Sequence, residues 1–304
     1  MERNKILLLA VKVAVFVLMA WIIADRLFLS ADFGEQWALF KKNLEGSNIT
    51  FFVIAFLLMP VNWGMEALKW KTLLQLEAPF FSFLKSVVAG ATFGFVTPAR
   101  TGEFVGRVFY IDGVNKTRAF YLSALGGIAQ TAITLTTGTI LIALWRNDPF
   151  MTGLATGVGA VFLFFYFRYD LLSGLAGKIP FLQKKQWVVE ATDLPDTTVL
   201  GKVLAIGFSR YTIYIAQYVS LALFFGVSND VWALFVRCGV YMVVQTFSPL
   251  MPSVDVTYRG GTALAIFEDI SANALGIVSV SFFGWFINLC IPSVLGYFFL
   301  LRKK

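Results

Sequence analysis

Six apolar runs, each about as long as a bilayer is thick, constrain the fold of this chain more than any other feature of its sequence. A helix that crosses the hydrocarbon core needs roughly 20 predominantly apolar residues. The chain is 58% apolar, only 14% charged and has a mean hydropathy of +0.74, which is more apolar surface than a soluble core hides. We therefore predict an all-α polytopic membrane protein with six full transmembrane helices at residues 6–24, 49–68, 119–145, 150–167, 199–225 and 272–301.

Two further apolar segments, 81–110 and 231–270, are interrupted by short polar stretches that contain proline. At bilayer depth the backbone leaves the helix only where protein or a water-filled cavity satisfies its polar groups. Broken segments at corresponding places in two halves of a chain are typical of transporter binding sites. We predict that both segments are re-entrant helical hairpins.

Lysine and arginine are unequally shared between the two sets of loops. Most lie in the loops on the side of the N-terminus, and the opposite loops hold only Arg26, Lys41, Lys42 and Arg146. The positive-inside rule then predicts a multi-pass protein of the cell membrane (inner or plasma membrane) with both termini in the cytoplasm. The net charge of +7 is attributed to this topology and to anionic lipids, not to nucleic-acid binding.

This charge distribution requires the first hairpin to open to the cytoplasm and the second to open outward. We predict a first half at 1–167, whose last span opens the second half, a cytoplasmic linker at 168–198, and the remainder of the second half at 199–304. Each half then consists of span, span, hairpin and span, in opposite orientations, which is an inverted repeat. The outer loop 25–48 is either an amphipathic interfacial helix or a short connector packed on the spans.

The residue types present argue against common catalytic chemistry. The sequence has no histidine, which is the commonest general base and metal ligand. Cys238 and Cys290 lie in apolar segments without CxxC spacing, and no glycine-rich nucleotide loop is recognisable. We expect a protein that is not an enzyme, with no catalytic residue, metal or cofactor.

Charged side chains at membrane depth are the strongest candidates for function. A charge at the bilayer centre costs from ~3 to more than ~10 kcal/mol, so such residues are expected to face the protein interior or a cavity. The basic ones are Lys12, Arg100, Arg107, Arg210, Arg237 and Arg259, and the acidic ones are Glu66, Glu103 and Asp255. This positive excess favours an anionic ligand. Lys12 and Arg210 lie near a cytoplasmic end, where a long side chain can instead reach the interface.

In the first break, Thr97 is expected to be an N-cap and Pro98 the first residue of a new helix. Arg100, Glu103 and Arg107 then share one helix face. Together with the helix N-terminus, this face suits a phosphate or carboxylate. The alternative is an internal ion network that ties the hairpin to its neighbours.

In the second break, Pro252 interrupts the helix, and Asp255 pairs with Arg259 at i, i+4. Asp255 either titrates in a proton-coupled cycle or serves only as the partner of Arg259. Candidates to complete the substrate-binding cavity are Arg237, Gln130 and Gln245, although polar residues of this kind often only join helices.

The sequence from Gly94 to Glu103, Gly-Phe-Val-Thr-Pro-Ala-Arg-Thr-Gly-Glu, followed by Arg107, resembles the first signature of the flippase-like membrane domain of lysylphosphatidylglycerol synthases and their stand-alone relatives. The pattern of spans agrees over nearly the whole chain. The second break differs from that family's Pro-Gly-Gly-x-Gly-x-x-Glu pattern, since it contains Pro-Ser-Val-Asp at 252–255 and Gly-Gly at 260–261.

This resemblance implies a stand-alone translocase, without the soluble synthase domain, that moves an anionic or aminoacylated phospholipid between leaflets. Arg100 and Arg107 would bind the headgroup phosphate, Glu103 would orient them, and Asp255 with Arg259 would gate the outer half. A homo-oligomer is compatible with this function. Two other functions stay open: an integral membrane transferase acting on polyprenyl-phosphate or other lipids, with Glu103 or Asp255 as base or metal ligand, and a structural membrane subunit.

Overall fold

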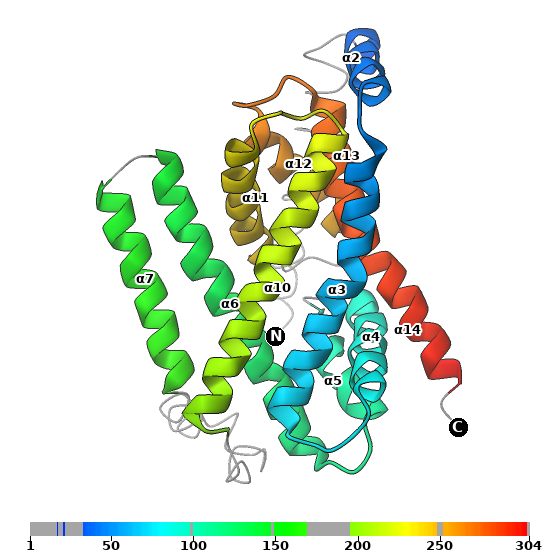
Figure 1. The fold of residues 1–304 in the computed structure, drawn as a ribbon, viewed down its shortest axis with the longest axis vertical. Helices are drawn as coiled ribbons and strands as arrows, with labels where there is room; N and C mark the ends of the chain where they lie inside the picture. Colours follow the sequence, from blue (N-terminus) through cyan, green and yellow to red (C-terminus); the bar gives the residue numbers. More distant parts are fainter. Residues whose placement is uncertain are drawn as a thin grey trace, which may run out of the picture.

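The described part of the chain is entirely helical. The computed structural model describes residues 17, 21, 33–97, 100–146, 149–168, 195–247 and 252–302, and these ranges contain no β-strand (Figure 1). Four of their helical runs are long and apolar enough to cross a bilayer: α3 (Ile49–Leu74), α6 (Lys116–Arg146), α10 (Thr197–Phe224) and the continuous run Ala274–Leu301. The all-α class is therefore confirmed, and these four runs indicate a membrane protein.

The last of these runs changes its winding part-way along. It consists of α13 (Ala274–Trp285), a π-helical turn η4 (Phe286–Cys290) and α14 (Ile291–Leu301). Single π-helical turns inside α-helices are frequent at functional sites, because the extra residue redirects the side chains around it.

The two remaining predicted spans are not among the four. The run 6–24 lies outside the described residues, apart from Val17 and Trp21. The run 150–167 forms α7 (Pro149–Phe167), a shorter apolar helix that packs beside α6.

The outer loop also contains a helix, α2 (Phe33–Glu45), as one of its two interpretations predicted. It packs on the end of α10, where the rings of Phe40 and Phe225 stack with their centroids 6.1 Å apart.

Each broken apolar segment folds as a pair of helices on either side of its break. The first pair is α4 (Phe80–Val96) and α5 (Gly102–Tyr110), and the second is α11 (Val231–Thr246) and α12 (Pro252–Phe267). In Figure 1 the first pair lies in the lower part of the bundle and the second in the upper part. Each pair therefore starts and finishes at one end of the bundle, and the two pairs use opposite ends.

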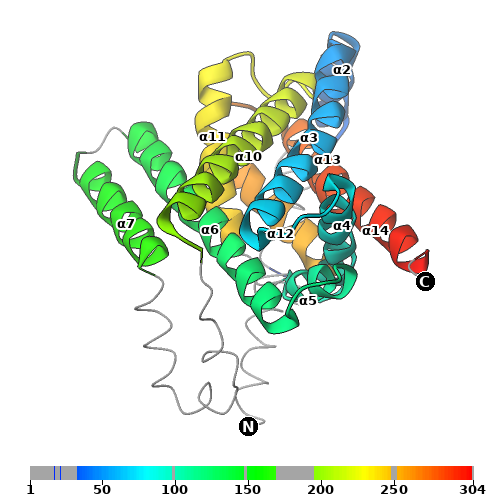
Figure 2. The same cartoon turned by 60° about the horizontal axis from the view of Figure 1, so that its bottom comes forward.

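Corresponding helices of the two halves make corresponding contacts. Helices α3 and α10 pack against each other, α14 packs against α4, and α6 packs against α11. Likewise, α5 contacts α6 and α12 contacts α13. Figure 2, in which the lower end comes forward, shows α4 and α5 between α6 and α14. Each contact made by the first pair thus has a counterpart made by the second.

Glycine allows α4 and α5 to pack with their backbones in contact. A Cβ atom added at Gly106 would lie 2.8 Å from the Cα of Gly90 and 2.6 Å from the ring of Phe93. Small residues of this kind permit close helix packing in membranes. They allow α5, which has only 9 residues, to lie flat against α4.

Charged and apolar residues are distributed in the opposite way to a soluble protein. Glu66, Lys69 and Arg107 are 2%, 1% and 5% exposed, whereas Phe81 and Phe150 are 68% and 76% exposed. Burying charge while exposing large apolar side chains suits a hydrocarbon solvent.

Candidate functional site

Thr97 joins the two helices of the first pair across their break. Its Oγ1 donates to the carbonyl of Phe93 at 2.9 Å and accepts from the amide of Gly102 at 2.8 Å. Arg100 has a left-handed backbone, with φ of 56°, which an α-helix does not accommodate. The new helix therefore begins at Gly102, later than predicted, and Pro98 lies outside the described residues.

Glu66, on α3, is the centre of a buried ion network. Its carboxylate lies 2.8 Å from Nζ of Lys69, 2.7 Å from Nη1 of Arg107 and 3.0 Å from Nη1 of Arg210. Arg107 is also paired with Glu103, one helical turn before it on α5. The network ties α5 and α10 to α3, and its carboxylates are fully engaged by cations.

Arg210 extends the network from α10 to α6. Its Nε donates to Oδ1 of Asn62 at 2.7 Å, and its Nη1 donates to Oε1 of Gln130 at 3.3 Å. Gln130, a predicted site residue, therefore holds this arginine in place. The guanidinium is 21% exposed, because one side of it faces a cavity.

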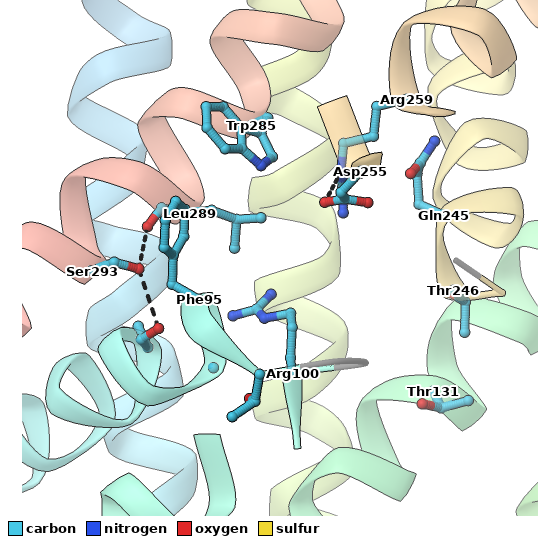
Figure 3. Close-up of a pocket in the computed structure, with 13 residues that line it drawn as sticks. Phe95, Arg100, Thr131, Gln245, Thr246, Asp255, Arg259, Trp285, Leu289 and Ser293 are labelled. Carbon is cyan, nitrogen blue, oxygen red and sulfur yellow. Dashed lines mark hydrogen bonds and ion pairs between the residues drawn. The ribbon is translucent and has the colours of Figure 1, made fainter. Parts of the chain in front are cut away.

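That cavity lies between residues that flank the breaks of the two helix pairs. Its larger lobe has a volume of about 310 Å³ and is lined from the first pair by Phe95, Thr97 and Arg100, and from the second by Gln245, Asp255 and Arg259. Trp285, Leu289 and Ser293 close another side (Figure 3).

A smaller lobe of about 210 Å³ shares part of this wall and adds Arg210 and Gln130. Its shared wall residues include Arg100, Gln245 and Arg259. Two segments more than 100 residues apart in the sequence therefore form one polar site.

Three arginines on this wall each have one carboxylate partner. The pairs are Arg100–Glu103 at 2.9 Å, Arg210–Glu66 at 3.0 Å and Arg259–Asp255 at 2.7 Å. Within the described ranges, each guanidinium keeps at least one terminal nitrogen that no carboxylate or carbonyl contacts. In Figure 3, Arg100 reaches from the first break towards the side on which Asp255 lies.

The site as a whole is positive. Among the described residues, the network and the cavity wall contain five cations (Lys69, Arg100, Arg107, Arg210 and Arg259) and three carboxylates (Glu66, Glu103 and Asp255), which leaves two net positive charges. Away from bulk water a small excess of this kind acts strongly on a ligand, because the surrounding dielectric is low. The arrangement favours an anion.

The other predicted residues are dispersed. Arg107 is buried between two carboxylates and is not on the cavity wall, so the geometry favours an internal role for it. Pro252 begins α12. Arg237 lies in the first half of α11, where its Nε donates to Oδ1 of Asp269 at 3.1 Å and its guanidinium lies 4.2 Å from the centre of the Trp145 ring.

The carboxyl of Asp269 lies in the loop after α12. Partial burial raises its pKa, but the hydrogen bonds and charge of Arg237 outweigh this effect and hold the pKa below its usual value. This ion pair therefore belongs to the end of the bundle and is separate from the cavity.

The sequence analysis did not place Lys69 at membrane depth, and it left two positions open for Arg210. The apolar run stops at residue 68, so Lys69 was counted with the cytoplasmic loop, although α3 continues to Leu74 and buries it. Its position three residues after Glu66 was the available signal, since i, i+3 residues share a helix face. Of the two positions that the sequence allows for Arg210, at depth or reaching the interface, the structure shows the first, since its side chain borders the cavity.

A scan against models of known protein families and a search of curated proteins both found no match to this chain. The resemblance of the first break to a flippase-like domain therefore stays a prediction. We base the function on the geometry of the cavity.

Proposed function

We propose that this protein is a flippase-like lipid translocase, which binds the anionic headgroup of a phospholipid in the central cavity and moves it between leaflets. The supporting observation is that two broken helix pairs, which start from opposite ends of the bundle, meet around one cavity with three arginines on its wall. In secondary transporters, discontinuous helices of this kind form the substrate site near the middle of the membrane.

The proposed topology has six spans, two re-entrant hairpins and both termini in the cytoplasm, in the cell membrane. The exchange of helix contacts between the halves supports an inverted repeat. Under this topology α4 and α5 enter from the cytoplasm, and α11 and α12 enter from outside. The two hairpins would then act as alternate gates, each of which opens the cavity to its own side when it moves.

The proposed path keeps the headgroup in the protein and the acyl chains in the bilayer. A guanidinium offers forked hydrogen bonds that match phosphate oxygens, and three of them converge on the cavity. Glu103 and Glu66 hold Arg100 and Arg210 from behind, which fixes the direction of their free N–H groups. The exposed apolar faces of the surrounding helices suit the lipid tails.

Reconstituted liposomes test this proposal. Purified protein is placed in vesicles with a fluorescently labelled anionic phospholipid, and its movement is followed by quenching of the outer leaflet with dithionite. We expect Arg100→Gln to slow movement by about tenfold or more, since a hydrogen bond to a charged group contributes about 1.5–3 kcal/mol. Arg100→Lys is expected to be intermediate, because it keeps the charge and loses the fork.

Arg302→Gln is the matched control, because Arg302 is exposed at the end of α14, away from the cavity. The Arg100 side chain is 41% exposed, and within the described part of the chain its one ion pair is with Glu103, so its loss is expected to leave the fold intact. Size-exclusion elution of each variant checks this. The proposed function would be overturned if the labelled lipid moved at the parental rate in Arg100→Gln. It would also be overturned if the lipid moved no faster in vesicles with the parental protein than in empty vesicles.

A further inference from the structure

Two residues that line the cavity each carry a buried amide oxygen with no hydrogen-bond partner among the described residues. These oxygens are Oε1 of Gln245, whose side chain borders both lobes, and Oδ1 of Asn288, whose side chain borders the smaller one. Asn288 is only 3% exposed. Buried polar atoms normally have partners, and an orphaned acceptor is costly, so these two oxygens require an explanation.

The orientation of the Gln245 amide is determined by its neighbour. Thr262 Oγ1 lies 2.8 Å and 3.1 Å from the carbonyls of Tyr258 and Arg259, so its hydroxyl hydrogen is used there. It can then only accept from Gln245, whose Nε2 lies 2.9 Å away. The nitrogen of Gln245 therefore faces Thr262, and its oxygen is the atom left over.

The Asn288 amide is fixed by a chain of acceptors. Nε2 of Gln217 donates to the carbonyl of Ala55 at 2.7 Å, so Oε1 of Gln217 is the atom that accepts from Nδ2 of Asn288 at 2.8 Å. The same Nδ2 donates to the carbonyl of Gly284 at 3.0 Å. A backbone carbonyl cannot donate, so the flipped amide is excluded and Oδ1 of Asn288 is unpaired.

A phosphate cannot satisfy these oxygens, because an ionised phosphate oxygen only accepts hydrogen bonds. A ligand that pairs with them directly must therefore bring donors, either hydroxyl or ammonium groups. Among the described residues the site carries two net positive charges, and the one carboxylate on its wall, that of Asp255, is already paired with Arg259. This field repels an ammonium group and leaves a hydroxyl unaffected.

Two further polar atoms without partners in the described ranges fit the same ligand. Nε1 of Trp285, on the larger lobe, is a donor, and the hydroxyl of Tyr211, on the smaller lobe, is both donor and acceptor. Tyr211 is 4% exposed. A lining whose residues carry orphaned donors and acceptors beside arginines matches a group that itself donates and accepts.

We infer that the cavity recognises a phosphodiester headgroup that carries free hydroxyls and no ammonium group, as a polyol or sugar phosphate does. This inference rests on the proposed function and narrows its substrate: of the anionic and aminoacylated phospholipids expected from the sequence, it selects the anionic, hydroxylated ones.

Binding to the detergent-solubilised protein tests the inference. Three short-chain lipids are compared by native mass spectrometry: phosphatidylglycerol, phosphatidylpropanol, which has the same charge and the same three-carbon headgroup without the two hydroxyls, and phosphatidylethanolamine, which has an ammonium group. We expect phosphatidylglycerol to bind about tenfold more tightly than either of the others, since a site built for a hydroxyl discriminates against the analogue that lacks it. Soluble glycerol 3-phosphate is expected to compete weakly.

Variants separate the two parts of the recognition. Gln245→Met removes one orphaned oxygen at similar length, and should bring the affinity for phosphatidylglycerol towards that for phosphatidylpropanol. Thr262→Val is its control, because it breaks the same contact between α11 and α12 and keeps the amide in the cavity. Arg100→Gln should lower the affinity for phosphatidylglycerol and that for phosphatidylpropanol by the same factor.

Equal binding of phosphatidylglycerol and phosphatidylpropanol, or tight binding of phosphatidylethanolamine, would overturn the inference. If Arg100→Gln still weakened binding and slowed translocation in that case, the proposed function would stand. If Arg100→Gln changed the affinity for none of the three lipids, both the inference and the proposed function would be overturned. If glycerol 3-phosphate bound as tightly as phosphatidylglycerol, the site would still recognise a phosphate with hydroxyls. The ligand would then be a soluble phosphate and not a lipid.

Discussion

Replacing Glu66 by glutamine should destabilise the fold more than any other single change in the ion network. The carboxylate has three cationic partners, and Lys69, 1% exposed, has no other ion-pair partner in the described part of the chain. Arg107 keeps Glu103, and Arg210 keeps its amide partners, so the uncompensated charge falls on Lys69. Removing one partner of a buried pair costs about 3–5 kcal/mol.

This magnitude predicts a measurable fall in melting temperature. At roughly 2 °C for each kcal/mol, Glu66→Gln should melt roughly 6–10 °C below the parent in detergent micelles, followed by tryptophan fluorescence. Lys69→Met alone should cost less, because Glu66 keeps two arginines. The double variant, with both Glu66→Gln and Lys69→Met, should recover at least half of the fall in melting temperature that Glu66→Gln causes alone. Glu77→Gln, which changes an exposed carboxylate in the loop after α3, is the matched control.

The order of these variants is the decisive result. A melting temperature of Glu66→Gln equal to that of Glu77→Gln, or a double variant less stable than the single one, would show that Glu66 is not the shared partner of the network. The ion pair between Lys69 and Glu66 would then contribute nothing measurable to the stability of the fold.

Two further predictions concern packing and the end of the bundle. Gly106→Ala should cost about 1–3 kcal/mol, because the added Cβ overlaps the backbone and a ring of α4, whereas Gly64→Ala, with open space around it, should be neutral or slightly stabilising; thermal melting of both variants checks this. Asp269→Asn should lower the melting temperature at neutral pH through loss of its pair with Arg237. Since the pKa of Asp269 is lower in the folded state, the pair contributes fully above the unfolded pKa and is lost as pH falls through the folded one, so the difference from the parent should shrink in acid. A difference that grows on acidification would contradict the assignment.

Apolar length and proline placement were enough to predict most of the helices. The runs at 49–68, 119–145, 199–225 and 272–301 all correspond to helices long enough to span a bilayer, and both broken segments fold as helix pairs. The predicted end of one helix was wrong in a way that affects the site: the apolar run ends at residue 68, whereas α3 continues to Leu74. A hydropathy pattern ends at a charge, whereas a helix can continue when that charge is neutralised internally, as Glu66 does for Lys69.

By itself the sequence determined the class of the fold, the two breaks and the presence of surplus arginine at depth, because these depend on local composition and on backbone chemistry. Only the tertiary structure decided which arginines face the cavity. Arg107 and Arg100 follow the same break, yet one is enclosed by two carboxylates and the other reaches the cavity. Their roles depend on how α3, α5 and α10 share Glu66, and that arrangement exists only when helices distant in the chain pack together.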